Sequence, residues 1–260
     1  MSDQIVFNSI GSGKPLLLIH PLGLDHHIWD FCIEDFAKIR TVITYDLPGH
    51  GASSVPEQGY KIEDLSEDLC QALETNQIGT IDALGLSIGG MILQDLASRN
   101  TQLVEQLILV DTTYKYTKEW QDNWSTRASM ARENGLESMV EQFLPAFFTE
   151  NYLNENNESI EYCRKTLLQM NGEGYAKACE ALSDCTLEDR AHLIESNTLI
   201  LCGDQDNPLF KDAALWLDDQ ISESKMHWLT NAQHLAPLEQ QKSFIDKVYD
   251  FLEDKLRISD

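Results

Sequence analysis

The sequence predicts an α/β fold: one mostly parallel β-sheet with helices on both faces and a helical insertion. Short apolar runs alternate along the chain with longer segments of helical periodicity, which is typical of such sheets. The 260 residues suffice for one large α/β unit with an insertion. Because 42% of the residues are hydrophobic and 24% are charged, a folded globular chain is expected.

Short apolar segments predict the strands. They are Ile5–Asn8, Leu16–His20, Thr41–Tyr45, Ile81–Leu84, Leu107–Val110, Thr198–Cys202 and Lys225–Leu229. The fifth and sixth contain continuous apolar runs, as fully buried parallel strands do. Helices are predicted at Ile62–Thr75, Ile88–Arg99 and Leu238–Leu252, and the last has Phe244 and Val248 on one apolar face.

One long stretch interrupts the alternation. Residues 114–190 contain helix-like sequence with several aromatic residues and no convincing strand, and the strand rhythm resumes at Thr198. We therefore expect a core of residues 1–113 and 191–260, with residues 114–190 inserted in it as a helical cap.

The charge excludes some classes of partner. Lys and Arg number 19 and Asp and Glu number 43, which gives a formal net charge of −24. Such a field repels phosphate backbones and anionic lipid, so neither nucleic acid nor a membrane surface is an expected partner. A small anionic substrate is still compatible with it, because local cationic groups override a screened global field.

The remaining composition predicts a cytoplasmic protein. The six cysteines are scattered without a C-x-x-C pair or a histidine cluster, so reduced, buried thiols are expected and no metal site. The first residues lack the basic and apolar regions of a signal peptide. The longest apolar stretch, Pro15–Leu24, is interrupted by His20 and is too short to span a bilayer.

A G-x-S-x-G pattern centres on Ser87. It follows the predicted strand Ile81–Leu84 and opens a predicted helix, which is the context of a nucleophilic serine. The sharp turn imposes strained backbone angles on the serine, and Gly85 and Gly89 supply the clearance that it needs. Because the start of the helix favours a developing oxyanion, the Ile88 N–H is a candidate donor to it.

A nucleophilic serine needs a base, and the base needs an orienting carboxylate. The loop after the sixth predicted strand contains Asp204 and Asp206, and the loop after the seventh contains His234. Both loops leave the carboxyl edge of the sheet, as Ser87 does. The pattern alone does not choose between Asp204 and Asp206, and Asp111, after another strand, is a third candidate acid.

The other histidines are weaker candidates for the base. His227 alternates with apolar neighbours inside a predicted strand, which indicates packing or a surface position. His20 ends a predicted strand and is interpreted as a structural or supporting residue. The rest, for which no matched partner is apparent, are His26, His27, His50 and His192.

With these residues in place, the chain resembles the α/β-hydrolase superfamily, and within it the 3-oxoadipate enol-lactonases. The similarity extends over nearly the whole length and is carried by the segments IHPLGLDHHIWD, ITYDLPGHGASSVP, LGLSIGGMILQ, LILCGDQDNP and NAQHLAPLEQ. Weaker similarity in the insertion includes WSTR and GEGYAKACEAL. The resemblance implies the α/β-hydrolase fold with its helical cap.

The resemblance also assigns the site. In the family the acid is the third residue after the glycine, which selects Asp206, and the histidine of the A-x-H-L setting falls on His234. The oxyanion donors fall on Leu22 and Ile88. Pro21 has no N–H and replaces the small polar residue or glycine of relatives. No metal or organic cofactor is implied.

The implied activity is hydrolysis of a carboxylic ester or lactone through an acyl-enzyme on Ser87, with a small-molecule substrate like 3-oxoadipate enol-lactone. Trp124 and Arg127 occupy neighbouring positions on a cap helix. Arg127 is interpreted either as pairing with a substrate carboxylate or as offsetting nearby surface acids. The alternatives are a broad carboxylesterase, a haloperoxidase-like perhydrolase or a carbon–carbon bond hydrolase with the same triad, and a non-catalytic ligand-binding protein. The sequence indicates no oligomeric state.

Overall fold

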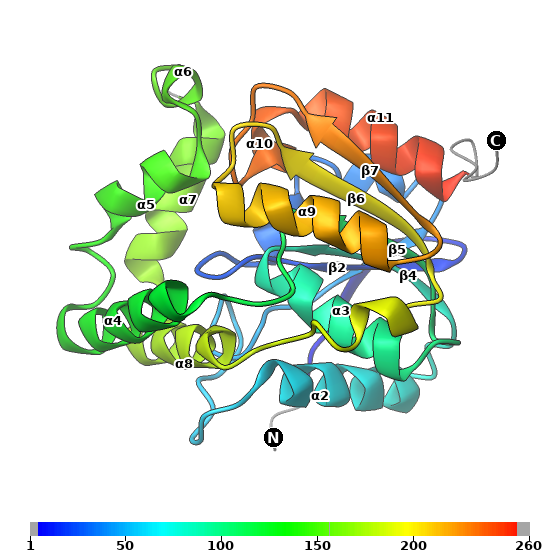
Figure 1. Ribbon diagram of the computed structural model, residues 1–260, viewed down its shortest axis with the longest axis horizontal. Coiled ribbons are helices and arrows are strands. Elements are labelled where there is room, and N and C mark those ends of the chain that lie inside the picture. Colours follow the sequence, from blue (N-terminus) through cyan, green and yellow to red (C-terminus); the bar gives the residue numbers. More distant parts are fainter. Residues whose placement is uncertain (1–4, 156, 254–260) are drawn as a thin grey trace.

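A computed structural model describes residues 5–155 and 157–253. Its centre is a seven-stranded sheet of order β1-β3-β2-β4-β5-β6-β7 (Figure 1). The strands are β1 (Asn8–Gly11), β2 (Pro15–Ile19), β3 (Thr41–Thr44), β4 (Ile81–Leu86), β5 (Val104–Val110), β6 (Asn197–Gly203) and β7 (Ser224–Leu229). β1 pairs antiparallel with β3, and the other neighbouring pairs are parallel. The predicted, mostly parallel sheet is confirmed.

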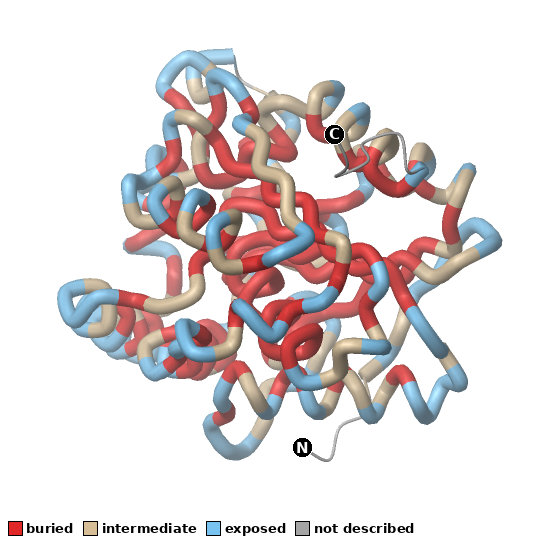
Figure 2. Tube along the Cα trace, turned by 45° about the vertical axis from the view of Figure 1, so that its right-hand side comes forward, coloured by how far each residue is buried: buried red, intermediate tan, exposed pale blue. Residues whose placement is uncertain are grey.

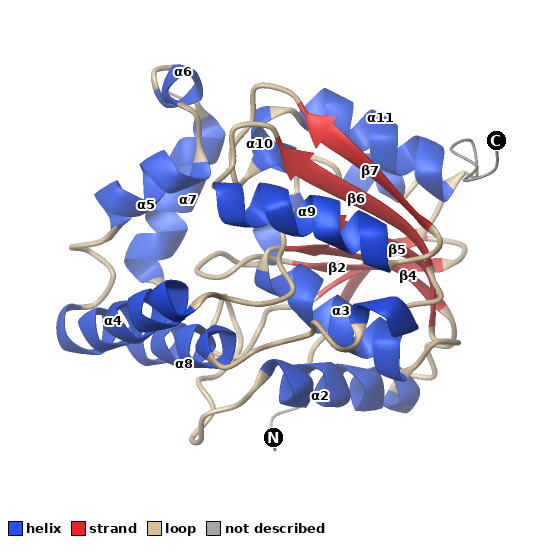
Figure 3. Ribbon diagram, viewed as in Figure 1, coloured by secondary structure: helices blue, strands red, loops and turns tan. Residues whose placement is uncertain are grey.

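Helices cover both faces of the sheet, as predicted. The core helices are α1 (Ile33–Phe36), α2 (Ile62–Thr75), α3 (Ile88–Arg99), α9 (Pro208–Gln220), α10 (Ala236–Glu239) and α11 (Gln241–Leu252), with the 3₁₀ helices η1 (His26–Trp29) and η2 (Ala191–Leu193). Figure 3 shows α3 and α9 in front of the sheet and α11 behind it. Because both faces are covered, β4 is buried along its whole length. The buried residues follow the strands through the middle of the molecule (Figure 2).

Two predicted elements differ from the structure. The first strand spans Asn8–Gly11 rather than Ile5–Asn8, because pairing with β3 begins only at Asn8. Phe7, the last residue of the apolar run 5–7, instead places its ring edge-on to Tyr45. The predicted helix Leu238–Leu252 is divided into α10 and α11 at Gln240, whose backbone is not helical (φ −123°, ψ 46°).

The region between β5 and β6 is helical. It contains α4 (Lys118–Asn134), α5 (Val140–Phe147), α6 (Glu150–Leu153), α7 (Glu158–Gln169) and α8 (Gly172–Ser183). An isolated antiparallel bridge between Lys115 and Thr186 joins its two ends. Figure 1 shows these helices beyond the carboxyl ends of the strands. The division at residues 114 and 190 stays a prediction.

No helix among the described residues combines the length and apolar character needed to cross a bilayer.

Candidate active site

Ser87 occupies the sharp turn between β4 and α3. Its backbone lies in a strained region with φ 56° and ψ −115°. Two hydrogen bonds from the β5 side hold it there: the Ser87 N–H donates to the Val110 carbonyl (3.0 Å), and the Thr112 hydroxyl donates to the Ser87 carbonyl (2.7 Å). The turn therefore directs the side chain out of the sheet from a fixed backbone. Sequence reasoning missed Thr112, since a threonine two residues after a strand carries no special signal.

The predicted clearance is needed on both sides of Ser87. A Cβ atom added to Gly85 would lie 2.4 Å from the Gly89 backbone. A Cβ atom added to Gly89 would lie 2.5 Å from the Ile19 carbonyl oxygen. Strand and helix thus approach too closely for any side chain at these two positions.

The structure brings the side chains of Ser87, His234 and Asp206 together. The His234 Nε2 atom lies 3.0 Å from the Ser87 Oγ, and the His234 Nδ1 atom lies 2.9 Å from the Asp206 Oδ2. All three residues are buried. Since an ionised carboxylate only accepts, Asp206 favours the tautomer with the proton on Nδ1 and leaves Nε2 free to accept the serine proton. The Asn207 N–H also donates to Asp206.

Asp204, which the residue pattern left open, has another position. Its carboxylate accepts hydrogen bonds from the Asn231 N–H (2.8 Å) and the Ala232 N–H (3.4 Å). These amides belong to the loop that carries His234. Asp204 therefore supports that loop, while Asp206 contacts the imidazole.

Asp111, the third candidate acid, is buried beside Asp206. Its Oδ1 accepts a hydrogen bond from the Gly203 N–H (2.7 Å), and ligand atoms of Asp111, Cys202 and Asp206 lie within 4.8 Å of one another. Burial, and next the Asp206 carboxylate, raise the pKa of Asp111 well above its ordinary range. Burial likewise raises the pKa of the Cys202 thiol. Both shifts favour the protonated forms of these two side chains, beside the carboxylate that contacts His234.

The predicted oxyanion donors belong to the segments that follow β2 and β4. Ile88 is the first residue of α3, and Leu22 lies in the turn after β2, where the Leu24 N–H donates to the Pro21 carbonyl (3.4 Å). Among the described residues, no backbone hydrogen bond outside the regular helices and strands has the N–H of Leu22 or of Ile88 as its donor. Both are therefore available to a ligand, and their role stays a prediction.

His20 supports the turn that carries Leu22. Burial lowers its pKa, so the ring is neutral. The Leu47 N–H donates to Nε2 (2.9 Å), which places the proton on Nδ1, and Nδ1 donates to the Pro21 carbonyl (2.8 Å). The ring thus joins the loops after β2 and β3, which agrees with its interpretation as a supporting residue.

The other histidines that the sequence left as weak candidates lie elsewhere. His26 contacts Asp46, and His27 contacts Asp30. Burial lowers the pKa of His50 to about 3. His227 lies on β7, and burial, followed by Lys247, lowers its pKa.

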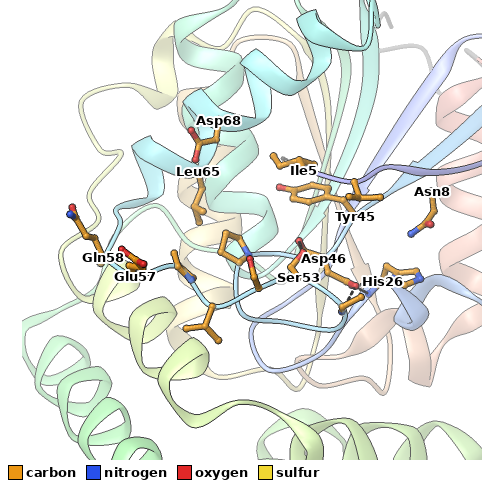
Figure 4. A pocket seen from close by; sticks show the side chains of 17 residues that line it. Ile5, Asn8, His26, Tyr45, Asp46, Ser53, Glu57, Gln58, Leu65 and Asp68 are labelled. Atoms are coloured by element: carbon orange, nitrogen blue, oxygen red, sulfur yellow. Dashed lines mark hydrogen bonds and ion pairs between the residues drawn. The ribbon is translucent and has the colours of Figure 1, made fainter. Parts of the chain in front are cut away.

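A cavity of about 840 Å³ lies apart from Ser87, Asp206 and His234 (Figure 4). It is bordered by residues 5–8 and by the loop after β3, and its labelled side chains include Tyr45, Asp46 and His26. None of the three clustered side chains lines it. The cavity was not predicted, because it forms only where residues 5–8 and α2 meet the loop after β3.

Aromatic rings extend from His234 into the cap. The Phe210 ring lies 4.3 Å from the His234 ring, Trp120 lies 6.2 Å from Phe210, and Trp124 lies 6.0 Å from Trp120, measured between centroids. Phe210 begins this series on α9, and the tryptophans continue it on α4. The predicted residue Trp124 is therefore connected to the catalytic candidates through aromatic packing.

Arg127 lies half-buried among these rings. Its guanidinium carbon lies 4.9 Å from the centroid of Trp124 and 5.1 Å from that of Phe143. Within the described part of the chain, the other arginines each have a carboxylate within 4.0 Å, and Arg127 has none; the paired ones are Arg40, Arg99, Arg132, Arg164 and Arg190. Arg127 therefore packs on aromatic rings without an ion pair among the described residues, and its role toward a substrate stays a prediction.

Comparison with known proteins places this geometry in context. A family profile described as alpha/beta hydrolase fold matches residues 14–241. The 3-oxoadipate enol-lactonase 2 of Acinetobacter baylyi is 31% identical over 229 residues, which cover 88% of this chain and 85% of that protein.

Two solved structures are also similar. The enol-lactonase from Burkholderia xenovorans superposes with a TM-score of 0.91 at 27% identity and covers 96% of both chains. A thermophilic esterase from Thermogutta terrifontis, solved with malate bound, superposes with a TM-score of 0.90 at 26% identity, over 96% of this chain and 93% of that one.

Proposed function

The chain belongs to the alpha/beta hydrolase fold family, and from that premise we propose that it is a serine hydrolase that cleaves a carboxylic ester or lactone. Ser87 is the nucleophile, His234 the base and Asp206 the acid that orients it. The observation that carries this proposal is the pair of hydrogen bonds on the His234 ring, 3.0 Å to Ser87 and 2.9 Å to Asp206. No metal or organic cofactor takes part in the proposed reaction.

In the acylation step, His234 Nε2 takes the proton of the Ser87 hydroxyl while Oγ attacks the carbonyl carbon of the substrate. The carbonyl electron pair moves onto oxygen, and the N–H groups of Leu22 and Ile88 hold that oxyanion. As the oxyanion collapses, the bond to the leaving oxygen breaks and protonated His234 donates its proton to it. The Asp206 carboxylate stabilises the charged imidazole throughout.

In the deacylation step, His234 takes a proton from water and the resulting hydroxide attacks the acyl carbon. The second oxyanion uses the same two donors. Its collapse releases the carboxylic acid, and the proton returns from His234 to the Ser87 oxygen. The enzyme is then restored.

For the substrate, we propose a lactone like 3-oxoadipate enol-lactone, which presents a free carboxylate. Similarity to two enol-lactonases supports this choice. The unpaired Arg127 between Trp124 and Phe143 supports it independently, because a guanidinium binds a carboxylate in a bidentate manner. An enol oxygen is also a better leaving group than an alkoxide, so acylation is comparatively easy.

A broad carboxylesterase is the second candidate. The Thermogutta terrifontis esterase, which superposes over nearly the whole chain, favours it. We also propose that the protein acts in the cytoplasm, because all six cysteines are free thiols.

The activity is tested with purified wild-type protein and Ser87→Ala on two substrates, the enol-lactone and a neutral p-nitrophenyl ester. We expect wild-type protein to hydrolyse the lactone with the higher kcat/KM, and Ser87→Ala to lose at least about 10³-fold on both. A higher kcat/KM on the neutral ester would favour the carboxylesterase instead. Full activity of Ser87→Ala on either substrate would refute the serine mechanism.

The role of Arg127 is tested by Arg127→Gln, with Arg132→Gln as the matched control on the same helix. Arg132 pairs with Glu173 and Glu180 and makes no contact with the aromatic series. We expect Arg127→Gln to lower kcat/KM for the carboxylated lactone about tenfold or more and to leave that for the neutral ester within about threefold. The control is expected to change neither. An equal effect of Arg127→Gln on both substrates would contradict the pairing.

A further inference from the structure

The cap contacts the loop of His234 directly. The segment 145–152 contains the end of α5 and the start of α6, and it forms hydrogen bonds with residues 233–239. The Leu235 N–H donates to the Phe147 carbonyl (3.0 Å), and the Gln233 side-chain amide donates to the Pro145 carbonyl (3.1 Å). The Tyr152 hydroxyl donates to the Leu238 carbonyl (2.9 Å).

Glu239, the last residue of α10, joins the same two segments through its carboxylate. Its Oε1 accepts hydrogen bonds from the Thr149 N–H (2.9 Å) and the Thr149 hydroxyl (2.7 Å). Its Oε2 accepts one from the Gln233 N–H (2.5 Å). A single carboxylate therefore holds a cap residue with one oxygen and the residue before His234 with the other.

The backbone is held by this contact on both sides of His234. The Gln233 N–H is held by Glu239, and the Leu235 N–H by the Phe147 carbonyl of the cap. Because the imidazole must keep one nitrogen near Ser87 and the other near Asp206, a small displacement of this backbone would lengthen at least one of those bonds. Misplacements of about 1 Å cost up to about a hundredfold in rate.

We propose that Glu239 is a positioning residue that couples the cap to the catalytic histidine: His234 is aligned with Ser87 and Asp206 while the segment 145–152 is docked on its loop. The inference rests on the proposed function, because it assigns to Glu239 the alignment of the proposed base. Docking of the cap over a substrate and alignment of the base are then one event.

The test compares Glu239→Gln with Tyr152→Phe, which removes a hydrogen bond between the same segments without touching the peptide groups beside His234. A glutamine side chain has a single acceptor oxygen, so it can accept from the Thr149 N–H or from the Gln233 N–H but not from both. We expect Glu239→Gln to lower kcat on the p-nitrophenyl ester by about tenfold to a hundredfold and to change KM less than about twofold. Tyr152→Phe is expected to stay within about twofold in both constants. Equal losses of kcat in the two variants would overturn the proposal.

A double-variant cycle tests the coupling itself. Thr149→Val removes the hydroxyl donor on the cap side of the bridge, so it is expected to lower kcat too. If Glu239 acts by joining Thr149 to Gln233, the double variant is no slower than Glu239→Gln alone. Multiplicative losses would overturn the coupling. If Glu239→Gln does not fold, Thr149→Val takes its place in the comparison with Tyr152→Phe. Equal losses of kcat in these two variants would then overturn the proposal.

The proton NMR signal of the His234 Nδ1–H, which donates to Asp206, provides a readout that needs no turnover. We expect it to shift or broaden in Glu239→Gln and to stay unchanged in Tyr152→Phe. If wild-type protein and Ser87→Ala are equally inactive on every ester, the proposed function fails, and this signal still judges the positioning. An unchanged signal in Glu239→Gln would overturn it.

Discussion

Asp111 and Asp206 lie close together at the ends of neighbouring strands, and their hydrogen bonds differ. Asp206 accepts from the Asn207 N–H and contacts His234. Asp111 accepts a bond from the Gly203 N–H, and its Oδ2 has no partner within hydrogen-bond distance among the described residues. A buried oxygen without a donor favours the protonated form of Asp111.

This difference predicts how stability depends on pH. Folding raises the pKa of Asp111. Its contribution to the stability of the protein is therefore fully present below its pKa in the unfolded chain, about 3.9, and is lost as the pH rises toward its pKa in the folded protein. Asp111→Asn keeps an acceptor for Gly203 and has no proton to lose. We expect the variant to gain stability relative to wild type as the pH rises above about 4, by up to about 1.4 kcal/mol per pH unit.

Urea unfolding of both proteins at several pH values measures this difference, and the many shared acidic groups cancel in it. A difference that stays constant with pH, or that moves toward wild type as pH rises, would contradict a protonated Asp111.

At the residue scale, the sequence predicted most of the candidate site. The order of serine, acid and histidine followed from where three strands end. The choice between Asp204 and Asp206 did not, because it depends on how one loop turns its side chains toward His234 or toward the Asn231 amide. Only the family resemblance selected Asp206.

At the element scale, the turn at Ser87 depends on space. Gly89 lies inside α3, where alanine would ordinarily stabilise the helix. A Cβ atom there would lie 2.5 Å from the Ile19 carbonyl of β2, while one on Gly59 would have no atom within 4 Å. We expect Gly89→Ala to lower the free energy of unfolding by about 1–3 kcal/mol and Gly59→Ala to change it by less than about 0.5 kcal/mol.

Urea unfolding compares these two variants with wild type. A Gly89→Ala variant as stable as Gly59→Ala would show that α3 can move away from β2 without cost, and the account of the turn would be wrong.

Local periodicity predicted the elements that have one consistent environment along their length, such as β4 and α3. It failed where a backbone changes direction without a glycine or proline. The break at Gln240 is such a place: residues 239–243 are polar helix formers, and the Gln240 side chain donates to the Asn231 carbonyl of the neighbouring loop. The shift of β1 has a similar cause, since Phe7 packs on Tyr45 without being in a strand.

At the scale of the whole molecule, the sheet and the helical insertion were predictable because each follows from patterns repeated along the chain. The contact through Glu239 was not, since it joins Thr149 to a residue 90 positions away and has no periodic signature. The net charge of −24 also acts at this scale. Because the screening length is about 8 Å, most of this charge acts only weakly on a bound small molecule, compared with a cation in contact with that molecule.

The central claim is that segments distant in sequence converge to make Ser87 a nucleophile. Mass spectrometry of the protein after reaction with a fluorophosphonate measures this most directly, with ester hydrolysis followed in the same sample. The account predicts a single adduct on Ser87, activity lost in proportion to labelling, and no adduct at that site in Ser87→Ala. Labelling slows strongly in His234→Ala. A protein that hydrolyses esters while Ser87 remains unlabelled would contradict the account.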